Sequence, residues 1–421
     1  MVARAFRAMV LNTTQLTREA SCSTKALGNV WNGLIRPHLE YGAEVIDEPR
    51  SGIWPEAESI QSRMGRKILR CGGSVTTEAL RGDLGWETMR GRRIARRLVW
   101  WGKLVKMPPD RWARKIYEFE REQCRRLPAT RNWCSYTRDL LIQTRLTECW
   151  RRQRPVKANE MGREAKVVTE VSMISGNVET TVYPPHRTEW RTVVWKAVHV
   201  HEQREWRRAM EARPKLDLYR QLKTVLKREE YLSSPDVIGR TTLFSLRSGT
   251  NKLRIDTGRN ERVLDVVTGK RRRLERKERI CRQCGTGTED EIHVLLYCPM
   301  YVPIRRELIH DLKKDSPADD TGLVMFLTGL CHAANVQWDR MEAEKTLILM
   351  MGKKRILQTM AVAKRIMQRR QAIIREQEGE TDTESDEEPV KPKPVRRVGR
   401  KGTNEVRSVR RRNNPPAQAT G

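Results

Sequence analysis

Four potential metal ligands occur close together, in the order Cys281-x2-Cys284-x8-His293-x4-Cys298. A C-x2-C turn brings two thiolates to the same side of a tight loop, where backbone amides can donate to the sulfurs. His293 and Cys298 are about one helical turn apart, so their side chains can complete a tetrahedron around Zn²⁺. Gly285 suits the chain reversal because glycine adopts a positive φ without strain. All four positions carry ligand-type residues, so we predict a closed structural zinc site with no place for a catalytic water.

The cysteine content favours a metal site in a reducing compartment over a disulfide framework. The nine cysteines are odd in number, and three of them belong to the proposed metal site. Disulfide frameworks use even numbers of cysteines in oxidising compartments. The alternative is a pair of free thiols in a loop beside a surface histidine, which the spacing disfavours. The isolated Cys22, Cys71 and Cys331 are interpreted as small buried apolar residues, and Cys331 and His332 as unrelated to the site.

Candidate catalytic carboxylates are poorly placed for two-metal chemistry. A polymerase active site holds its metal ions on carboxylates that typically include adjacent aspartates on an apolar hairpin. The only adjacent pair here, Asp319-Asp320, lies in the polar sequence SPADDTG. Pro235-Asp236 with Asp256 could suggest a metal-dependent nuclease, but the spacing is too long. The chain also has no Walker, dinucleotide-binding or serine-nucleophile motif, so we expect that it is not an enzyme by itself.

The charge of the chain predicts polyanionic partners. Its 421 residues include 83 Lys and Arg against 53 Asp and Glu, a formal net charge of +30. Such a chain attracts RNA or DNA by counterion release. An anionic membrane surface is the alternative, but no stretch approaches the roughly 18 consecutive apolar residues of a membrane span. The basic N-terminus lacks the apolar core and cleavage site of a signal peptide, so we expect a nuclear or cytoplasmic protein that is not secreted.

Two groups of basic residues are candidates for phosphate contact. The first is the block Lys270, Arg271, Arg272 and Arg273, directly ahead of the cysteine cluster. The second comprises Arg92, Arg93, Arg96 and Arg97, which share one face of a predicted helix. The alternative for the second group is an ordinary solvated helix face.

The periodicity of apolar residues predicts a mainly helical protein. Apolar stripes indicate helices at 59–69 and 90–105, and a helix over 26–35 that stops at Pro37. Further helices are expected at about 215–230, at 241–251 with a terminal Gly turn, and as one long basic helix at 341–375. Thr/Val-rich runs at 166–169 and 179–182 could pair as a short hairpin.

These elements suggest five regions along the chain. They are a thumb-like helical bundle (1–125), a Trp/Arg-rich connecting region (126–210), a helical region with the zinc unit at about 278–305 (211–335), the long helix (336–375) and an acidic-then-basic tail (376–421). The interleaved Trp and Arg of the second region could stack bases or form a helix core with Arg at its rim. The tail has little apolar content, so we expect it to be disordered.

Several segments occur in an order that resembles the C-terminal region of LINE-type (non-LTR) retrotransposon reverse transcriptases. The segment 34–45 (LIRPHLEYGAEV) is similar to the family's stretch downstream of the polymerase core, although Ile46 replaces the usual Trp. The segments 66–70 and 77–87 follow, with the turn Leu84-Gly85-Trp86, and then 246–253 with Gly258-Arg259. Cys281, Cys284, His293 and Cys298 match the family's CCHC knuckle, and Cys298-Pro299, Tyr301 and Arg305 match its exit.

The resemblance implies a module that grips element RNA and target DNA during target-primed reverse transcription. The polymerase polypeptide that the family places upstream would then be a partner, and the four ligands would hold Zn²⁺. We expect a zinc-dependent RNA- or DNA-binding module without catalysis of its own. The alternatives are an inactive fragment of an RNA-directed DNA polymerase and a host-adopted protein-interaction scaffold.

Overall fold

The computed structural model describes most of the chain and is mainly helical, as predicted. The described residues are 2–18, 23–46, 54–151, 169–171, 178–180, 187–265, 269–315, 321–332, 340–352 and 355–378. The described residues between 2 and 374 form one compact unit. Beyond 378, the expected disordered tail lies outside the described residues. No described helix combines the length and apolarity that a membrane crossing needs.

The N-terminal helices build one end of the main core. Their buried faces include Leu27, Trp31, Ile60, Met64 and Ile68. The elements are α1 (Val2–Arg18), α2 (Thr24–Val30), a π-helical turn η1 (Trp31–Ile35), α3 (Arg36–Glu40), α4 (Pro55–Leu69) and α5 (Thr77–Leu84).

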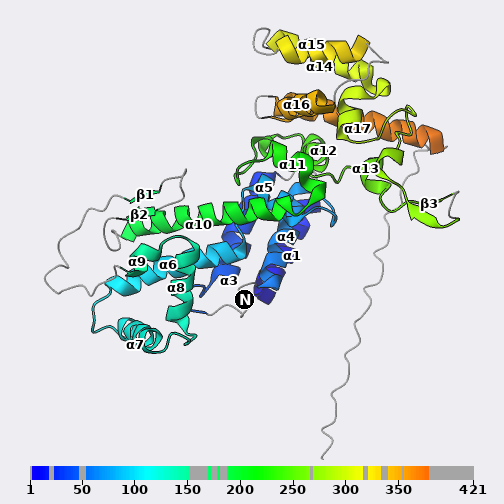
Figure 1. Ribbon diagram of the computed structural model, residues 1–421. Helices are drawn as coiled ribbons and strands as arrows, with labels where there is room; N and C mark the ends of the chain where they lie inside the picture. The colour runs from blue at the N-terminus through cyan, green and yellow to red at the C-terminus, as the bar shows by residue number, and fades with distance from the viewer. Residues whose placement is uncertain are drawn as a thin grey trace, which may run out of the picture. The chain divides into compact units, whose positions relative to one another are not determined.

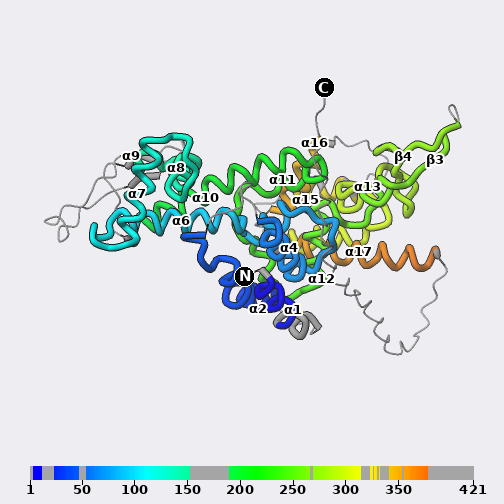
Figure 2. The backbone as a smooth tube through the Cα atoms, turned by 90° about the horizontal axis from the view of Figure 1, so that it is seen from below, coloured from blue at the N-terminus to red at the C-terminus, as the bar shows by residue number. Residues whose placement is uncertain are grey.

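A second, smaller core lies among the next five helices. α6 and α10 lie side by side in both views of the backbone (Figures 1 and 2). The indole of Trp190 on α10 donates to the carbonyl of Leu98 on α6 at 2.9 Å, and the predicted stripe of α6, from Ile94 to Val105, is buried. The helices are α6 (Met89–Lys106), α7 (Trp112–Arg126), α8 (Trp133–Gln143), α9 (Thr147–Arg151) and α10 (Arg187–Glu211).

The rest of the compact unit completes the main core around the cysteine cluster. Its helical elements are η3 (Pro214–Leu216), α11 (Asp217–Leu222), η4 (Glu230–Ser233), α12 (Val237–Arg247), α13 (Arg254–Thr257), η5 (Arg276–Glu278), η6 (His293–Tyr297), η7 (Pro299–Tyr301), α14 (Val302–Asp315), α15 (Thr321–His332), α16 (Arg340–Met351) and α17 (Ile356–Glu378). Trp206 and Met210 at the end of α10 also belong to this core. The division of the chain into five regions stays a prediction.

Two antiparallel strand pairs accompany the helices. β1 (Thr169–Val171) pairs with β2 (Val178–Thr180), and these strands overlap the Thr/Val-rich runs at 169 and 179–180, while the rest of those runs lies outside the described residues. β3 (Arg262–Leu264) pairs with β4 (Arg271–Arg273) in the register Val263↔Arg272. The second pair was not predicted, because its strands are charged and lack an alternating apolar pattern.

Three helix predictions differ from the structure. The helix over 26–35 does not stop at Pro37, because Pro37 lies in the first turn of α3, where its missing N–H is tolerated. The helix expected over 215–230 ends at Leu222, since the buried Lys223 ammonium binds the Glu229 carboxylate and the Glu229 amide donates to the Asp83 carbonyl. These tertiary contacts hold the following segment in a non-helical path.

The single helix predicted over 341–375 is two helices, α16 and α17. α16 ends at Met351, and the chain passes through Gly352 before α17 begins at Ile356. The hydroxyl of Thr359 on α17 donates to the carbonyl of Met350 in the last turn of α16. This bond satisfies a carbonyl that an unbroken helix would have used internally.

Candidate metal centre and basic surface

The first two cysteines lie on a tight loop directly after η5. An isolated antiparallel bridge joins Ile280 to Thr288 and closes the base of the loop. Within it, the Cys281 amide donates to the Gly287 carbonyl at 3.0 Å. The Gly285 amide donates to the Cys281 carbonyl at 2.9 Å. The loop therefore turns both thiols to one side, as the C-x2-C spacing predicts.

Two glycines make this turn possible. Gly285 has a φ of +71°, which confirms the predicted left-handed residue after the second cysteine. Gly287, which the sequence did not single out, has a φ of +66°. A Cβ atom on Gly287 would lie 3.2 Å from Nδ1 of His293, so glycine also leaves room for the imidazole ring.

A π-helical turn brings His293 and Cys298 together. The Cys298 amide donates to the His293 carbonyl, five residues back, at 2.6 Å. A π-helix has more residues per turn than an α-helix, so it aligns side chains five positions apart. The Asp290 carboxylate caps the turn by accepting from the His293 amide at 2.9 Å. The H-x4-C spacing is thus met by a π turn, where the sequence suggested an ordinary helical one.

The four predicted ligands converge on one point. One donor atom from each of Cys281, Cys284, His293 and Cys298 lies within 4.8 Å of the other three. The Cys284 Sγ atom is 3.3 Å from His293 Nε2. Bonds of about 2.0–2.3 Å to a tetrahedral ion would place such donors about 3.3–3.8 Å apart. The four residues could therefore hold a metal ion.

Hydrogen bonds connect the thiols with the loop backbone and with one another. The Thr286 amide donates to the Cys284 Sγ atom at 3.4 Å, as expected for an amide beside a metal-bound sulfur. A hydrogen bond from Cys298 lowers the pKa of Cys281 to about 3, and the same hydrogen bond raises the pKa of Cys298. Binding of a cation would displace thiol protons here, since a metal is bound by thiolates.

The centre is part of the main core. Cys281 and Cys298 are buried within it, together with Val294, Leu295 and Leu296 of the π turn. The guanidinium of Arg305, 0% exposed, donates to the Cys298 carbonyl at 2.6 Å. A structural ion here would therefore stabilise the contact between the loop and the core, as well as the loop itself.

A buried carboxylate anchors the loop to α17. Glu289, 0% exposed, accepts two hydrogen bonds from Arg370 and one from the Arg254 amide at 2.9 Å. The contact between Glu289 and Arg370 was not predicted from the sequence. No local signal identifies this pair, because its two residues are far apart in the chain.

The arginines of the basic block ahead of the cysteines form β4, and Lys270 directly precedes it. Lys270, Arg271 and Arg273 are exposed, and their side chains make no hydrogen bond or ion pair with the described residues. Arg272 points to the other face of the strand and binds both carboxylate oxygens of Glu278 at 2.6 Å. Three of the four predicted residues are thus available to a ligand, and Arg272 has a structural contact.

The second basic group does not form an open surface. Arg93 is 2% exposed, donates to the Leu39 carbonyl at 3.2 Å and lies over the Trp54 ring. Arg97 is also 2% exposed and donates to Thr137. Both the prediction of phosphate contact and the solvated-face alternative are wrong for these two arginines, because α3 and α8 cover their side of α6.

The other two members of this group neutralise a buried acid. Arg92 and Arg96 both bind the Glu40 carboxylate, which is 2% exposed. Burial alone would raise the pKa of Glu40, but the hydrogen bond and charge of Arg92, with those of Arg36 and Arg96, lower it overall. Arg96 also binds Glu44 at 3.1 Å. Their positive charge is therefore largely neutralised by carboxylates of the protein itself.

The carboxylates considered for nuclease chemistry have structural contacts. Asp236 accepts from the Gly239 amide at 2.9 Å, which caps α12, and binds Lys364 at 3.0 Å. Asp256 binds Lys215 at 3.3 Å. Asp319-Asp320 lies outside the described residues.

Comparisons with known proteins find nothing similar to this chain. No family model, no curated protein and no solved structure matches it. The chemistry of the centre is therefore argued from its own donors, which are three thiols and one imidazole.

Proposed function

We propose that this protein is a zinc-stabilised nucleic-acid-binding module that is not catalytic by itself. The observation that carries the proposal is that the metal-ligand cluster and an exposed basic hairpin are neighbours in the chain. The Cys281–Cys298 cluster follows directly on the β3–β4 hairpin, whose exposed Lys270, Arg271 and Arg273 have no partner among the described residues. Figure 2 shows this hairpin extending beyond the neighbouring helices.

Zinc is the metal that the donor set favours. Three thiolates and one imidazole in a tetrahedral arrangement are typical of structural Zn²⁺ sites, whereas Mg²⁺ and Ca²⁺ prefer oxygen ligands. All four positions belong to the protein, which leaves none for a reacting water. The role we propose for the ion is therefore to stabilise the fold.

Hydrogen bonds connect the metal loop with the base of the β3–β4 hairpin. Arg279, two residues before Cys281, donates to the Leu274 carbonyl at 3.0 Å and to the Ile255 carbonyl at 2.9 Å. The Leu274 amide, directly after β4, donates to the Glu261 carbonyl at 3.1 Å, directly before β3. An ordered metal loop would thus fix the base of the hairpin and the direction of its cations.

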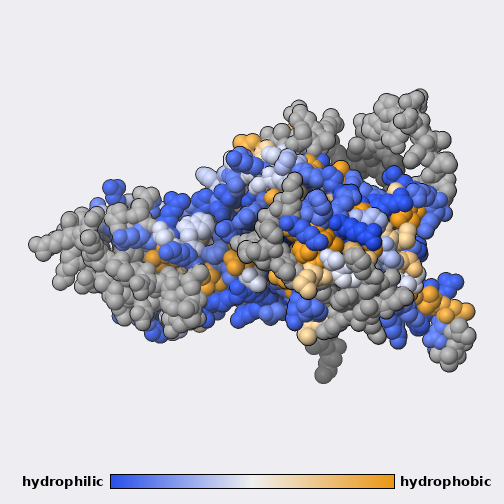
Figure 3. Space-filling model, turned by 90° about the horizontal axis from the view of Figure 1, so that it is seen from above, coloured by the Kyte–Doolittle hydropathy of each residue, from blue (hydrophilic) through white to orange (hydrophobic). Residues whose placement is uncertain are grey.

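The local charge suits a phosphate backbone. Between Arg259 and Arg282 there are ten Lys and Arg against four Asp and Glu. Exposed cations on a strand pair attract phosphates without reading base edges. Figure 3 shows hydrophilic residues, interrupted by hydrophobic patches, on the described part of one face. We expect binding that is strongly salt-dependent and only weakly sequence-dependent.

The resemblance to LINE-type reverse transcriptases supports the same proposal. It would make RNA or DNA of such an element the ligand, and a polymerase-bearing polypeptide the protein partner. The proposal does not depend on this resemblance, since the hairpin and the cluster suggest the function by themselves.

The test is binding of the full chain to labelled RNA and duplex DNA across a salt series, with zinc measured on the same sample. The hairpin variant carries Lys270→Ala, Arg271→Ala and Arg273→Ala. The control carries Arg131→Ala, Arg151→Ala and Arg208→Ala, which removes three exposed charges that pair with nearby carboxylates. We expect the hairpin variant to bind nucleic acid at least about tenfold more weakly than the unmodified chain. The slope of log K against log salt concentration should be reduced by about 2–3. Equal losses in both variants would show that the hairpin is not the contact surface.

A further inference from the structure

The β3–β4 hairpin has two different faces. Directly opposite residues of an antiparallel strand pair lie on the same face, and neighbours along one strand alternate between the two faces. One face, which we call the inner face, carries Val263 and Arg272. The other, which we call the outer face, carries two pairs of opposite residues, Arg262 with Arg273 and Leu264 with Arg271.

The inner face is held by the protein itself. Val263 is half-buried. Arg272 binds both carboxylate oxygens of Glu278 at 2.6 Å, and its Nε atom lies 3.5 Å from a carboxylate oxygen of Asp265. Two acidic residues thus neutralise the one arginine of this face. These contacts determine which side of the strand pair turns toward the rest of the protein.

The outer face is exposed and positively charged. Burial alternates along both strands, and all four outer side chains are exposed. The side chains of Arg262, Arg271 and Arg273 make no hydrogen bond or ion pair with the described residues. Like charges directly opposite each other destabilise a strand pair, and the register places Arg262 opposite Arg273. Anions bound between them would remove this repulsion, so the face suits a polyanion.

An apolar side chain stands among these charges. Leu264 is 64% exposed and lies opposite Arg271, two residues along β3 from Arg262. A single exposed leucine is normal on a protein surface. Here, however, its neighbours on the outer face are all arginines. A ligand that covers the whole face must therefore offer anionic groups to the arginines and an apolar group beside them.

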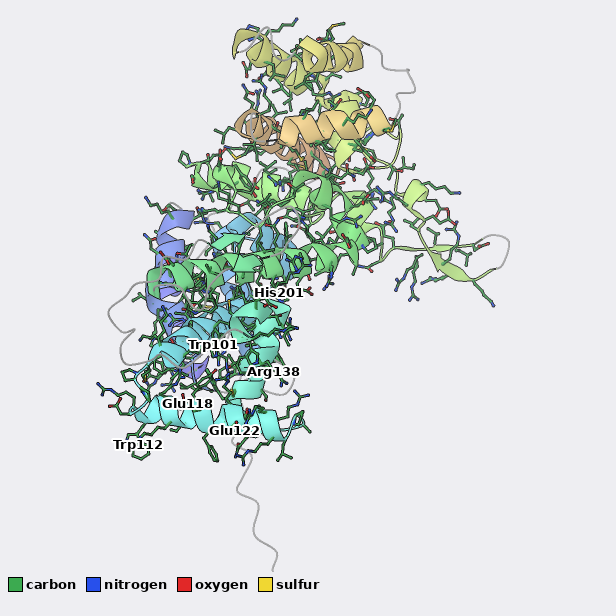
Figure 4. The ribbon with its side chains drawn as sticks, turned by 60° about the vertical axis from the view of Figure 1, so that its left-hand side comes forward. Trp101, Trp112, Glu118, Glu122, Arg138 and His201 are labelled. Carbon is green, nitrogen blue, oxygen red and sulfur yellow. The ribbon has the colours of Figure 1, made fainter. Side chains whose placement is uncertain are left out.

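The major groove of duplex DNA meets both requirements. It is about 12 Å wide in B-form DNA and admits a two-stranded β-ribbon, whose strands lie about 4.8 Å apart. Phosphates line its two walls, and thymine displays a methyl group on its floor. The hairpin extends beyond the neighbouring helices in Figure 4, as it does in Figure 2, so a groove can approach it.

Two other nucleic acids fit the outer face less well. Duplex RNA has a deep, narrow major groove that protein side chains cannot read, and uracil lacks the methyl group of thymine. Proteins that bind single strands stack the bases on aromatic side chains. No Phe, Trp or Tyr occurs between Arg259 and Arg282, so the hairpin offers no such platform.

We propose that the outer face of the β3–β4 hairpin enters the major groove of duplex DNA, which is the preferred ligand of this protein. Arg262, Arg271 and Arg273 bind phosphates of the groove walls, and Leu264 contacts thymine methyl groups. Arg262 thereby joins the cations of the basic block as a DNA contact. This inference rests on the proposed function, because it names the ligand class of the same hairpin.

The test measures binding of the full chain to four labelled probes of one length across a salt series. They are a duplex DNA, the same duplex with uracil in place of thymine, the duplex RNA of that sequence, and one strand of the DNA. The uracil-containing duplex lacks only the methyl groups, so it isolates the contact that we assign to Leu264.

Two single variants have matched controls. Arg262→Ala removes one outer cation, and its control is Arg131→Ala, whose side chain is 81% exposed and binds Asp139. Leu264→Ser removes the apolar contact, and its control is Leu349→Ser on α16, where the leucine is 62% exposed. Thermal melting verifies that each variant is folded.

We expect duplex DNA to bind at least about tenfold more tightly than duplex RNA or the single strand. Arg262→Ala should weaken DNA binding and reduce the slope of log K against log salt concentration by about 1. Leu264→Ser should weaken DNA binding about threefold at an unchanged slope, and should no longer distinguish thymine from uracil. Both controls should bind as the unmodified chain does.

The outcomes separate this inference from the proposed function. Equal or tighter binding of duplex RNA or of the single strand would overturn the inference and leave the proposed function standing. So would variants Arg262→Ala and Leu264→Ser that bind DNA as their controls do. Failure of the unmodified chain to bind any of the four probes would overturn both.

Discussion

Arg370 binds Glu289 through two hydrogen bonds, from Nε at 2.8 Å and from Nη2 at 3.1 Å. The arginine is 8% exposed and the carboxylate 0%. The pair joins α17 to the loop between the second cysteine and the histidine of the metal centre. A residue 72 positions beyond the last ligand therefore helps to hold the loop in place.

Removal of one partner of this pair should strongly destabilise the protein. We expect Arg370→Met to lower the free energy of unfolding by about 3–5 kcal/mol, because it leaves the Glu289 charge buried without its counterion. Urea unfolding measures the change. The control is Arg365→Met on the same helix, whose ion pair with Glu307 is exposed and should contribute little. Similar losses for the two variants would show that the buried pair has no special role.

Loss of a metal ligand should affect the main core as well as the loop. We expect Cys281→Ser to lose the bound zinc, about one ion per chain, and to expose amides of the π turn and η7 to hydrogen exchange. The reason is that Cys281 and Cys298 pack within the core, and the energy of zinc binding is folding energy. Cys331→Ser, which changes a half-buried thiol outside the cluster, should keep its zinc. If Cys281→Ser retains both metal and protection, the four residues are not the ligands.

The buried Asp83 should be essential for stability. It is 0% exposed and accepts hydrogen bonds from the hydroxyls of Tyr219, at 2.7 Å, and Tyr231, while Arg247 lies 3.7 Å away. We expect Asp83→Ala to cost about 3–5 kcal/mol in chemical unfolding, since Arg247 then keeps only Glu229 as counterion. Tyr219→Phe removes one donor and should cost about 1–3 kcal/mol. A larger loss for Tyr219→Phe than for Asp83→Ala would contradict this ranking.

The contact between His199 and Glu87 should make stability depend on pH. His199 Nδ1 lies 3.3 Å from the carboxylate, and the hydrogen bond to Glu87 raises the pKa of His199 above 6.5. Burial alone would raise the pKa of Glu87, but His199 and Arg92 lower it below 4.5. The stabilisation by His199 is therefore fully present below about pH 6.5 and is lost as the pH rises through its folded pKa. The stabilisation by Glu87 is present above about pH 4.5 and is lost as the pH falls.

His199→Gln tests this dependence. Its stability deficit should be largest between about pH 4.5 and 6.5 and should shrink by pH 9. It should not exceed about 1 kcal/mol, because the His199 side chain is 38% exposed. His201→Gln is a control whose effect on stability should have the opposite sign at low pH. Burial lowers the pKa of His201, so protonation of this imidazole below about pH 6.5 destabilises the folded protein, and its removal should relieve that loss. Chemical unfolding at several pH values measures both, and a deficit of His199→Gln that does not vary with pH would contradict the assignment.

Local spacing was enough to predict several helices and the Cys281–Cys298 cluster, which could hold a metal ion. The C-x2-C and H-x4-C spacings concern side chains only three and five residues apart, so the turn that joins them is a local property. The buried stripes of α4 and α6 follow from the helical repeat in the same way. The break at Gly352 was not predicted, because it depends on a contact with Thr359 in a separate helix. The early end of α11 was not predicted, because it depends on a contact with Asp83, which is distant in sequence.

The sequence by itself determined which residues share a face and which can bind a metal, since both depend on spacing along one element. Tertiary structure decided what covers each face. Arg93 and Arg97 have the same charge and helical setting as the arginines of any solvated helix, yet a carbonyl, a hydroxyl and aromatic rings from distant elements bury them. Arg271 and Arg273 stay exposed because the described residues place nothing over their side of β4, and Lys270 is exposed directly before the strand. The periodicity of a chain carries no information on such long-range partners, and these partners determine whether a charge is available to a ligand.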